Sequence, residues 1–435
     1  MIIFFGVDKM SSINRLNIAE GVYFNSVRDS RFKTMKLSAN LFVPLSAETA
    51  SANALLAGVL SRSCKAYPDF TALSRKLSAL YGAELSVSTT KVGENQVISV
   101  SASGLDDRYA LDGDSIAAEL SALLCGVIFE PNVKDDAFIP EEVEQERRQL
   151  LDVIDSEYNE KRIYANGKMI EIMCADEVFG VKRYGTAEKI KETTAQSLYL
   201  TWQNLLKTAV IEIMYIGDSA PDKAVEVFTE TFSKMNRQPA KLHTEVIREA
   251  GEIKRETEAV DVSQAKLVMG FRAGVAVPEK EITATALMCA ILGGTATSKL
   301  FCNVREKQSL CYYCAARYDK HKGVVVIDSG VETENVEKLE RGILKEVEDM
   351  KNGVISDFEI DSTKMAMINV YQSSNDTVSG IEAWYSSQLL QDGFKTIEEA
   401  CAKINAVTKE EIVAAANKLQ LDTVYVLTNQ QEVKS

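Results

Sequence analysis

Apolar residues recur along the chain with two spacings, and each spacing predicts one kind of element. Spacings of three and four residues over 336–350 predict a long helix, which Gly353 ends. Alternating apolar residues at 84–90 and 96–102 predict a β-hairpin that turns at Gly93. Strands grouped in hairpins and helices grouped in pairs indicate the α+β class, because α/β units would alternate the two.

The same order of elements occurs twice, which indicates an internal duplication. Near the end of each half, a helix after a threonine leads into an apolar strand, and the copies match without gaps at an offset of 214. The matching positions are Ile190, Thr194, Leu198, Leu205 and Val210 with Ile404, Thr408, Ile412, Leu419 and Val424. Earlier in each half, a helix and a hairpin match at an offset of 227, with Leu73 and Val97 in the places of Leu300 and Val324.

Length and charge narrow the class of protein further. A chain of 435 residues is too long for one core, so the duplication predicts two domains, 1–232 and 259–435, joined by a polar linker at 233–258.

A net charge of −14 argues against binding to nucleic acid or to anionic membrane surfaces. No apolar run approaches the roughly 18–20 residues of a membrane helix, and the apolar start at 1–7 lacks the basic leader of a signal peptide. We therefore expect a cytoplasmic protein.

The eight cysteines are scattered, and in a long cytosolic chain we expect them to be reduced. Only Cys311 and Cys314 have the spacing of a redox or metal pair. The segment 309–316 predicts a strand, on which residues three apart face opposite ways. No second pair completes a zinc site. We therefore expect neither a redox centre nor a metal centre at these cysteines.

Arg305 and Tyr312 lie seven residues apart, with Arg305 near the end of a predicted helix and Tyr312 in the strand that follows. A guanidinium and a phenol can both donate hydrogen bonds to a peptide carbonyl, and they bind an oxyanion more strongly. In the alternative interpretation, Arg305 is a surface residue of the helix and Tyr312 packs on a neighbour. Tyr313 would replace Tyr312 if the register were shifted by one residue.

The stretch from Gly293 to Tyr312 resembles the substrate-clamp motif in the C-terminal half of the pitrilysin-type (M16) zinc peptidases. Three further stretches resemble the same family in the same order, 31–44, 184–194 and 264–271, so the resemblance covers nearly the whole chain. It implies two homologous M16/LuxS-like metallohydrolase-type domains, each a mostly antiparallel sheet packed with helices. It also implies that Arg305 and Tyr312 are substrate-binding residues.

The catalytic motif of that family is His-x-x-Glu-His on a helix, in which two histidines bind zinc and the glutamate acts as a general base. In this chain the corresponding helix holds Ala54, Ala57 and Gly58 at the motif positions. None of these side chains can bind a metal or move a proton. The two histidines of the chain, His243 and His321, lie elsewhere, and we expect them to be solvated polar residues.

The third zinc ligand of the family is a glutamate, and the resemblance places Glu146 at that position. Glu146 lies in a strongly charged helix, so we favour a solvated helix face over a metal site. One carboxylate does not hold zinc tightly, because most of the binding free energy of about 10–16 kcal/mol requires the full set of ligands. We therefore expect Glu146 to be a remnant ligand at most, and the chain to contain no metal or other cofactor.

Two-chain members of the M16 family divide the work, since one chain carries His-x-x-Glu-His and its partner supplies the arginine and tyrosine. This chain resembles the second kind, including the group associated with aminopentanol modification of elongation factor P. The resemblance implies a catalytically inactive, substrate-binding subunit of an M16B-type heterodimeric zinc peptidase that acts on peptides.

The alternative is a non-enzymatic peptide-binding or scaffold protein, a homodimer or a subunit of a complex, in which the Arg/Tyr pair is ancestral. A self-sufficient metallopeptidase is disfavoured by the ligand types available.

Overall fold

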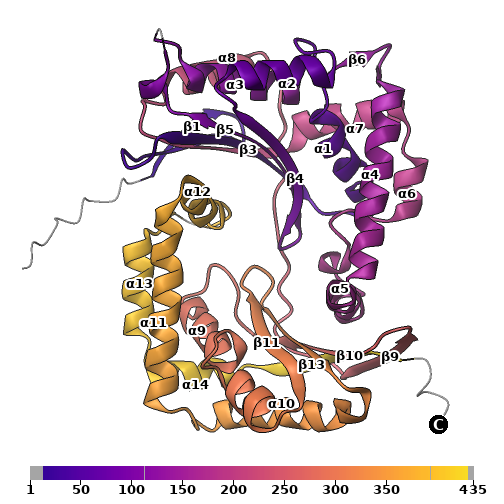
Figure 1. The fold of residues 1–435 in the computed structure, drawn as a ribbon, viewed down its shortest axis with the longest axis vertical. Coiled ribbons are helices and arrows are strands. Elements are labelled where there is room, and N and C mark those ends of the chain that lie inside the picture. The colour runs from indigo at the N-terminus through magenta and orange to yellow at the C-terminus, as the bar shows by residue number, and fades with distance from the viewer. Residues whose placement is uncertain (1–12, 112, 392, 430–435) are drawn as a thin grey trace, which may run out of the picture.

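The computed structural model describes residues 13–111, 113–391 and 393–429, and it contains two large sheets that helices cover (Figure 1). The N-terminal stretch 1–7 lies outside the described residues. The sheet of the first half has the order β1-β2-β8-β3-β5-β4. Its strands are β1 Asn14–Ala19, β2 Val22–Arg28, β3 Thr34–Pro44, β4 Glu84–Val92, β5 Asn95–Leu105 and β8 Val210–Gly217.

The sheet of the second half has the order β11-β12-β10-β13-β9. Its strands are β9 Lys254–Val260, β10 Ala265–Arg272, β11 Cys311–Asp319, β12 Val324–Val331 and β13 Gln420–Asn429. One pair in each large sheet is parallel, β2 with β8 and β13 with β9, and the other pairs are antiparallel. The predicted α+β class, with mostly antiparallel sheets and helices packed on them, is therefore confirmed.

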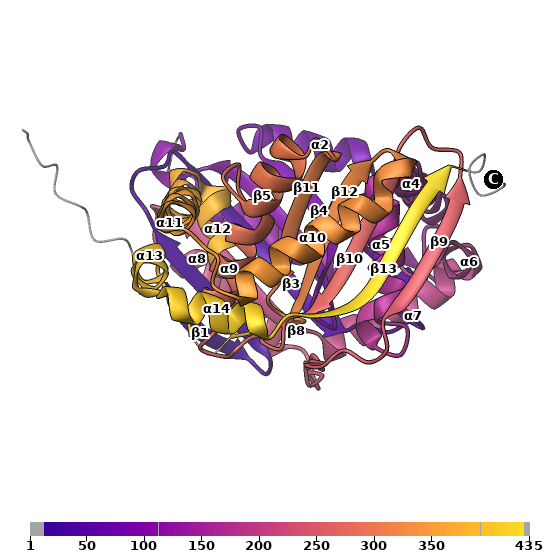
Figure 2. The same cartoon turned by 90° about the horizontal axis from the view of Figure 1, so that it is seen from below.

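Helices cover the outer face of each sheet, and one helix of each half reaches across to the other half. In the first half these are α1 Ala50–Leu60, α2 Phe70–Ala79, α3 Ile116–Phe129, α4 Pro140–Asn159, α5 Lys161–Met173, α6 Ala187–Glu192, α7 Ala195–Thr208 and α8 Asp222–Ser233. In the second half they are α9 Ile282–Gly293, α10 Val336–Lys351, α11 Asp357–Ser373, α12 Val378–Ser386, α13 Ile397–Ala406 and α14 Lys409–Asn417. The predicted stripe on α10 is buried against the sheet that this helix crosses (Figure 2).

The arrangement of elements agrees with the duplication read from the sequence. The run α6-α7-β8 in the first half has α13-α14-β13 as its counterpart in the second half, and the hairpin β4–β5 has β11–β12. The segments that begin α7 and α14 carry side-chain capping boxes at Thr194 and Thr408, which satisfy the free amides of the first turn. One pair of counterparts differs, because α2 is an α-helix whereas Leu300–Lys307 is a π-helix.

Each half buries the inner face of the other half's sheet with one helix (Figure 1). Helix α5 of the first half packs on the second sheet through Ala165, Met169 and Met173, which lie against Val268, Tyr425 and Leu427. Helix α12 of the second half packs on the first sheet through Val378, Ile381 and Tyr385, which lie against Phe42, Met214 and Ile216. Among the described residues, the apolar part of each inner face thus packs against a helix of the other half.

The approach of α5 to its sheet requires a glycine. A Cβ added at Gly270 of β10 would lie 2.5 Å from the Met169 Sδ atom and 2.7 Å from the Met173 Sδ atom. Such contacts are far shorter than a van der Waals separation of about 3.5–4.0 Å. Gly270 therefore allows α5 to lie close to the middle of the second sheet.

A buried cluster of charges joins the two halves at the tips of their equivalent hairpins. Lys322, in the β11–β12 turn, has no exposed surface, and its Nζ lies 2.6 Å from a carboxylate oxygen of Glu94, in the β4–β5 turn, and 2.6 Å from one of Glu177. Arg272 of β10 pairs with Glu177 at 2.6 Å and with Asp422 at 2.8 Å. Cations of the second half thus bind the carboxylates that the first half buries.

The linker predicted at 233–258 and the structure differ at both ends. Residue 233 still belongs to α8, and residues 254–258 belong to β9, which pairs in parallel with β13 at the edge of the second sheet. The side chains of 255–257 are exposed, so a charged sequence is compatible with a strand at this place.

Replacing Lys322 with methionine should destabilise the protein by about 3–5 kcal/mol, because two buried carboxylates lose their shared cation. The free energy of unfolding in urea measures the change. The matched control is Lys345→Met on α10, where an exposed pair with Asp349 is lost and about 0.3–0.5 kcal/mol is expected. A Lys322→Met effect as small as that of the control would contradict a structural role for the cluster.

The stabilising effect of Glu177 should depend on pH. Burial alone would raise the pKa of Glu177, but hydrogen bonds from Arg272 and Lys322 outweigh it and lower the pKa below the ordinary 4.5. The stabilisation is therefore complete above pH 4.5 and is lost as the pH falls through the lower, folded-state pKa.

The difference in unfolding free energy between the native protein and Glu177→Gln should accordingly shrink below pH 4.5. Glu337→Gln, at an exposed position on α10, serves as the control and should give a difference near zero throughout. If the difference in unfolding free energy between the native protein and Glu177→Gln stayed constant with pH, the charge of the Glu177 carboxylate would not be the source of the stabilisation.

Candidate functional site

The helix that holds the altered motif positions, α1, lies in the core of the first half between the sheet and α4. Ala54 and Ala57 are buried, and Gly58 faces α4. A glycine within a helix weakens it by about 0.5–1 kcal/mol relative to alanine, so its presence calls for a reason. The reason is steric, because a Cβ at Gly58 would lie 2.6 Å from the Oε2 atom of Glu146.

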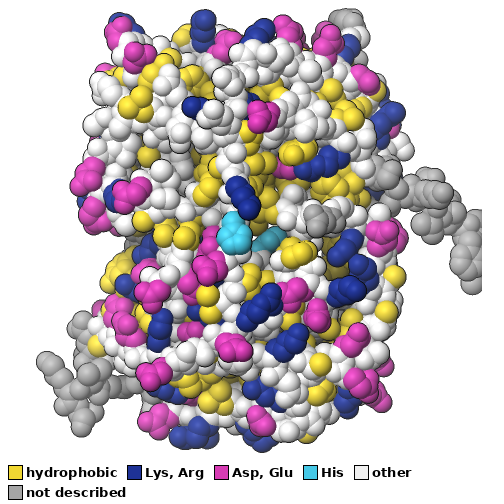
Figure 3. Space-filling model, turned by 180° about the vertical axis from the view of Figure 1, so that it is seen from behind, with side chains coloured by type: hydrophobic (Ala, Val, Ile, Leu, Met, Phe, Trp, Pro, Cys, Tyr) yellow, Lys and Arg dark blue, Asp and Glu magenta, His cyan; other side chains and the backbone are white. Residues whose placement is uncertain are grey.

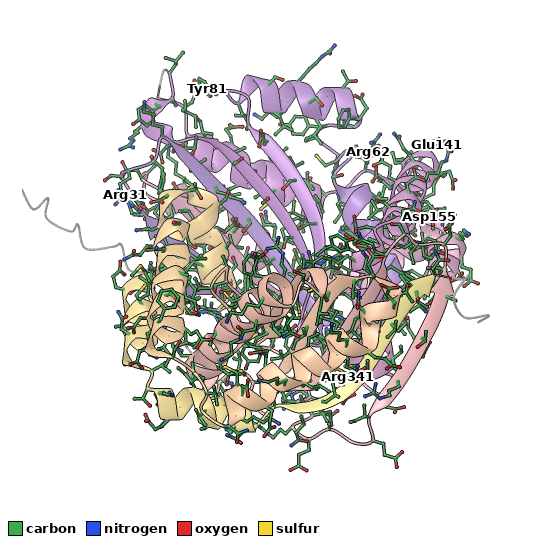
Figure 4. All side chains as sticks on the ribbon, turned by 60° about the horizontal axis from the view of Figure 1, so that its bottom comes forward. Arg31, Arg62, Tyr81, Glu141, Asp155 and Arg341 are labelled. Carbon is green, nitrogen blue, oxygen red and sulfur yellow. The ribbon has the colours of Figure 1, made fainter. Side chains whose placement is uncertain are left out.

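Glu146 is buried, with 8% of its surface exposed, and it does not lie on a solvated helix face as predicted. The missing side chain at Gly58 leaves the room that the carboxylate occupies. Arg62, just beyond the end of α1 and beside α4 (Figure 4), places its Nη1 atom 3.4 Å from Glu146 Oε1. Burial raises the pKa of Glu146 above its ordinary value in spite of the arginine.

These residues do not fit a zinc ion. Alanine, alanine and glycine offer no ligand atoms, and the positive charge beside Glu146 is the guanidinium of Arg62, which also donates to Gln145 Oε1 at 2.7 Å. Within 13–111, 113–391 and 393–429, no group of three or more histidine, cysteine or acidic side chains is placed to hold a metal.

The second half also carries small residues at the positions that align with this part of α1. Residues 54–60 of α1, Ala-Leu-Leu-Ala-Gly-Val-Leu, align with residues 286–292 of α9, Ala-Leu-Met-Cys-Ala-Ile-Leu. The counterparts of the three motif positions are thus Ala286, Cys289 and Ala290, and they line a cavity of about 1020 Å³ beside α13 and α14. Neither half supplies the ligands of a catalytic zinc site at these positions.

Neither histidine lies on α1 or α4. His243 is exposed in the segment between the halves, and His321 is half-buried in the β11–β12 turn. Figure 3 shows histidine side chains at the waist where the two halves meet. Burial and the neighbouring charge of Lys320 lower the pKa of His321, which favours its neutral form.

The structure brings Arg305 and Tyr312 together. Arg305 lies on the π-helix and Tyr312 on β11, and the Arg305 Nε atom donates a hydrogen bond of 2.9 Å to the Tyr312 main-chain oxygen. The guanidinium lies over the ring of Phe301 at 4.5 Å and pairs with Glu306 at 3.2 Å. A π-helical turn often marks a functional site, because it shifts side chains from regular helical positions.

The side chain of Tyr312 is 55% exposed, and its hydroxyl donates a hydrogen bond of 2.6 Å to Glu332 Oε1. This bond to a carboxylate raises the pKa of Tyr312, so the phenol keeps its proton and remains a donor. The two side chains are adjacent, but the guanidinium binds a main-chain carbonyl and the hydroxyl binds Glu332. A substrate would have to replace Glu332 as the acceptor for Tyr312.

Tyr313, the alternative to Tyr312, faces the opposite way and is fixed between the halves. Its ring lies under the guanidinium of Arg162 from α5, with 4.3 Å from the Cζ atom to the ring centre. Its hydroxyl is buried and has no hydrogen-bond partner. Of the two tyrosines, Tyr312 is therefore the one that can reach a ligand.

The small residues of α1 and the Arg305–Tyr312 pair each lie beside the edge strand of a sheet. Strand β4, next to α1, is the last strand of the first sheet, and β11, next to the π-helix, is the last strand of the second. Edge strands carry main-chain amides and carbonyls that can pair with an extended peptide.

The prediction that Cys311 and Cys314 face opposite ways was wrong. Cys311 pairs with Val331 and Cys314 pairs with Ser329, with a break in register between Cys311 and Tyr313. Because Val331 and Ser329 are two residues apart on one strand, the two cysteines share a face. Tyr312 is the extra residue of this β-bulge, and nothing in the spacing of the apolar residues indicates it.

Comparison with known proteins agrees with these observations. Residues 192–367 match a family model described as the peptidase M16 inactive domain. Over 419 residues the chain is 31% identical to the probable inactive metalloprotease YmfF of Bacillus subtilis (strain 168), covering 96% of this chain and 98% of that protein. It is also 28% identical, over 169 residues, to the uncharacterized zinc protease YmxG of the same organism, covering 38% of this chain and 40% of that protein.

A conserved protein from Enterococcus faecalis V583 has the same fold, with a TM-score of 0.90 at 27% identity over 97% of this chain and 100% of that one. The match to the inactive domain and to an inactive metalloprotease confirms the expectation of a pseudoenzyme. In the part of the chain that the structure describes, no helix is long and apolar enough to cross a membrane. The chain belongs to the M16 peptidase family, and it is an inactive, metalloprotease-like member of that family.

Proposed function

We propose that this chain is the substrate-binding subunit of a two-chain zinc peptidase, whose partner carries His-x-x-Glu-His. The observation that carries the proposal is the contrast between the two halves. Arg305 and Tyr312 are adjacent at an open sheet edge, whereas Ala54, Ala57 and Gly58 hold the positions that the resemblance assigns to the zinc motif. Groups that bind a peptide serve proteolysis only if another chain holds the zinc.

An extended peptide binds by adding a strand to one of the edges, β4 or β11, that border the region between the halves (Figure 1). The guanidinium of Arg305 can donate to a peptide carbonyl while it lies over Phe301. Tyr312 exchanges its acceptor, from Glu332 to the peptide. Both groups can donate to the oxygen of the scissile carbonyl, on which negative charge develops during hydrolysis, while a zinc held by the partner would supply the activated water.

Two further observations support a two-chain peptidase of the cytoplasm. Bacillus subtilis has one relative described as an inactive metalloprotease and another described as a zinc protease, which is the combination that a two-chain enzyme needs. The eight cysteines, all within the described residues, are free, as expected for a protein of the reducing cytoplasm.

The alternative function is a non-enzymatic binding or scaffold protein, and one observation favours it. Both members of the pair already have internal partners, since Arg305 binds the Tyr312 carbonyl and Glu306, and Tyr312 binds Glu332. In that case the pair stabilises the β-bulge and no peptide displaces these contacts.

Mixing this chain with the His-x-x-Glu-His partner should increase cleavage of an extended fluorogenic peptide above that of the partner alone. Arg305→Ala should lower kcat/KM by roughly 10- to 100-fold, since a hydrogen bond from a charged donor contributes about 1.5–3 kcal/mol. The control is Arg341→Ala on α10, where the arginine is exposed and pairs with Glu337, and no change is expected. Equal activity of the two variants would leave the scaffold function as the better account.

Tyr312→Phe should lower kcat/KM by about 2- to 10-fold, because one neutral hydrogen bond contributes about 0.5–1.5 kcal/mol. Tyr313→Phe provides the matched comparison, since that hydroxyl is buried without a partner, and it should leave kcat/KM unchanged. Steady-state kinetics of both variants with the partner chain test the assignment. A loss confined to Tyr313→Phe would move the clamp to the neighbouring residue.

A further inference from the structure

The β-bulge at Tyr312 brings two thiols together within the predicted clamp. Cys311 and Cys314 lie opposite Val331 and Ser329, and two residues along a regular strand such as β12 span about 6.6–6.8 Å. Disulfides in proteins span Cα separations of about 4.4–6.8 Å. The pair therefore lies at the upper end of the range in which a disulfide forms after a small movement.

The surroundings give the two thiols different chemistry. A hydrogen bond from Cys314, together with Ser329 and the charge of Arg305, lowers the pKa of Cys311 to about 7 against the effect of burial. The pKa of Cys314 is raised, because its thiol donates the hydrogen bond to Cys311 and is buried. Cys311 is half-buried and Cys314 is buried. Cys311 is thus the nucleophile, and Cys314 remains a protonated thiol beside it.

Five of the other thiols do not share these properties, because burial raises their pKa and makes them inert at neutral pH. They are Cys64, Cys125, Cys174, Cys289 and Cys401. Cys302 is half-buried on the π-helix, and its thiol donates to the main-chain oxygen of Ala296 at 3.8 Å. Cys302 therefore serves as the internal control for any reaction assigned to the pair.

We propose that Cys311 and Cys314 form a peroxide-sensitive dithiol, which closes to a disulfide and loosens the Arg305–Tyr312 clamp. The Cys311 thiolate attacks an oxygen of a hydroperoxide and the O–O bond breaks. With uptake of one proton this yields a sulfenic acid and an alcohol, or water from hydrogen peroxide. The Cys314 thiol then attacks the sulfenic sulfur, the S–S bond forms and water leaves. The peroxide gains two electrons and the dithiol loses two.

The link to the clamp follows from the position of Tyr312 between the two cysteines. Closing the disulfide draws the ends of the bulge together and removes the thiolate that faces Arg305. The carbonyl that Arg305 Nε binds belongs to the bulge residue, so its position changes with the bulge. This second part rests on the proposed function, whereas disulfide formation does not.

The first experiment follows the chemistry in the full-length chain. The reduced protein is treated with hydrogen peroxide, then alkylated and mapped by mass spectrometry without reduction. The expected product is a disulfide within the peptide that holds Cys311 and Cys314, reversed by dithiothreitol. Cys314→Ser should stop at a sulfenic acid on Cys311 that dimedone traps, and Cys302→Ser should behave as the native chain does. No disulfide, or one that involves another cysteine, overturns the proposal.

The second experiment tests the effect on peptide binding in the reconstituted peptidase. Oxidation should lower kcat/KM by about fivefold, the effect of one hydrogen bond of about 1 kcal/mol, and Cys311→Ser/Cys314→Ser should be insensitive to peroxide. If the disulfide forms and activity is unchanged, regulation of the clamp is disproved. If Arg305→Ala has no effect on cleavage in reduced protein, the proposed function fails, and the mapped disulfide still stands or falls by the first experiment.

Discussion

The buried ammonium of Lys322 is the contact on which the arrangement of the two halves depends. A lysine with no exposed surface is stable only when carboxylates compensate for its lost hydration, and Glu94 and Glu177 do so from the other half. Glu94 and Lys322 lie in equivalent turns, so the pseudo-symmetric hairpins meet at oppositely charged residues. The edge strands β4 and β11 run into these turns, so the cluster fixes how the two edge strands lie relative to one another.

The positions that the resemblance assigns to the zinc motif hold small side chains, and they lie beside a buried carboxylate that contacts a guanidinium. Without a side chain at Gly58 the carboxylate of Glu146 occupies the vacated space, and Arg62 provides the cation that a buried carboxylate requires. The same positions in the second half line a cavity with small side chains. In the first half the space beside these small residues is thus filled by Glu146 and its contact with Arg62, whereas in the second half it stays open.

Periodic features of the chain could be read from the sequence, since they recur over many residues. The duplication, the hairpin at Gly93, the stripe on α10 and the small residues of α1 all correspond to elements of the structure. Features that depend on a single residue, or on a contact with a residue far away in the sequence, could not be predicted from the sequence. A one-residue bulge at Tyr312 leaves no periodic signal, and the burial of Glu146 depends on Gly58, far away in the sequence. The hydrogen bond from Arg305 to a main-chain carbonyl and the bond from Tyr312 to Glu332 likewise arise only in three dimensions.

The exchange of α5 and α12 has a consequence for the history of the chain. A single half-length ancestor would have left the inner face of its sheet open and carried a helix with nothing to cover. Two copies of such an ancestor satisfy each other by swapping that helix, which makes a homodimer the smallest stable form. In the joined chain, each half therefore buries apolar surface that the other half exposes when it stands alone, so the two halves depend on one another for burial.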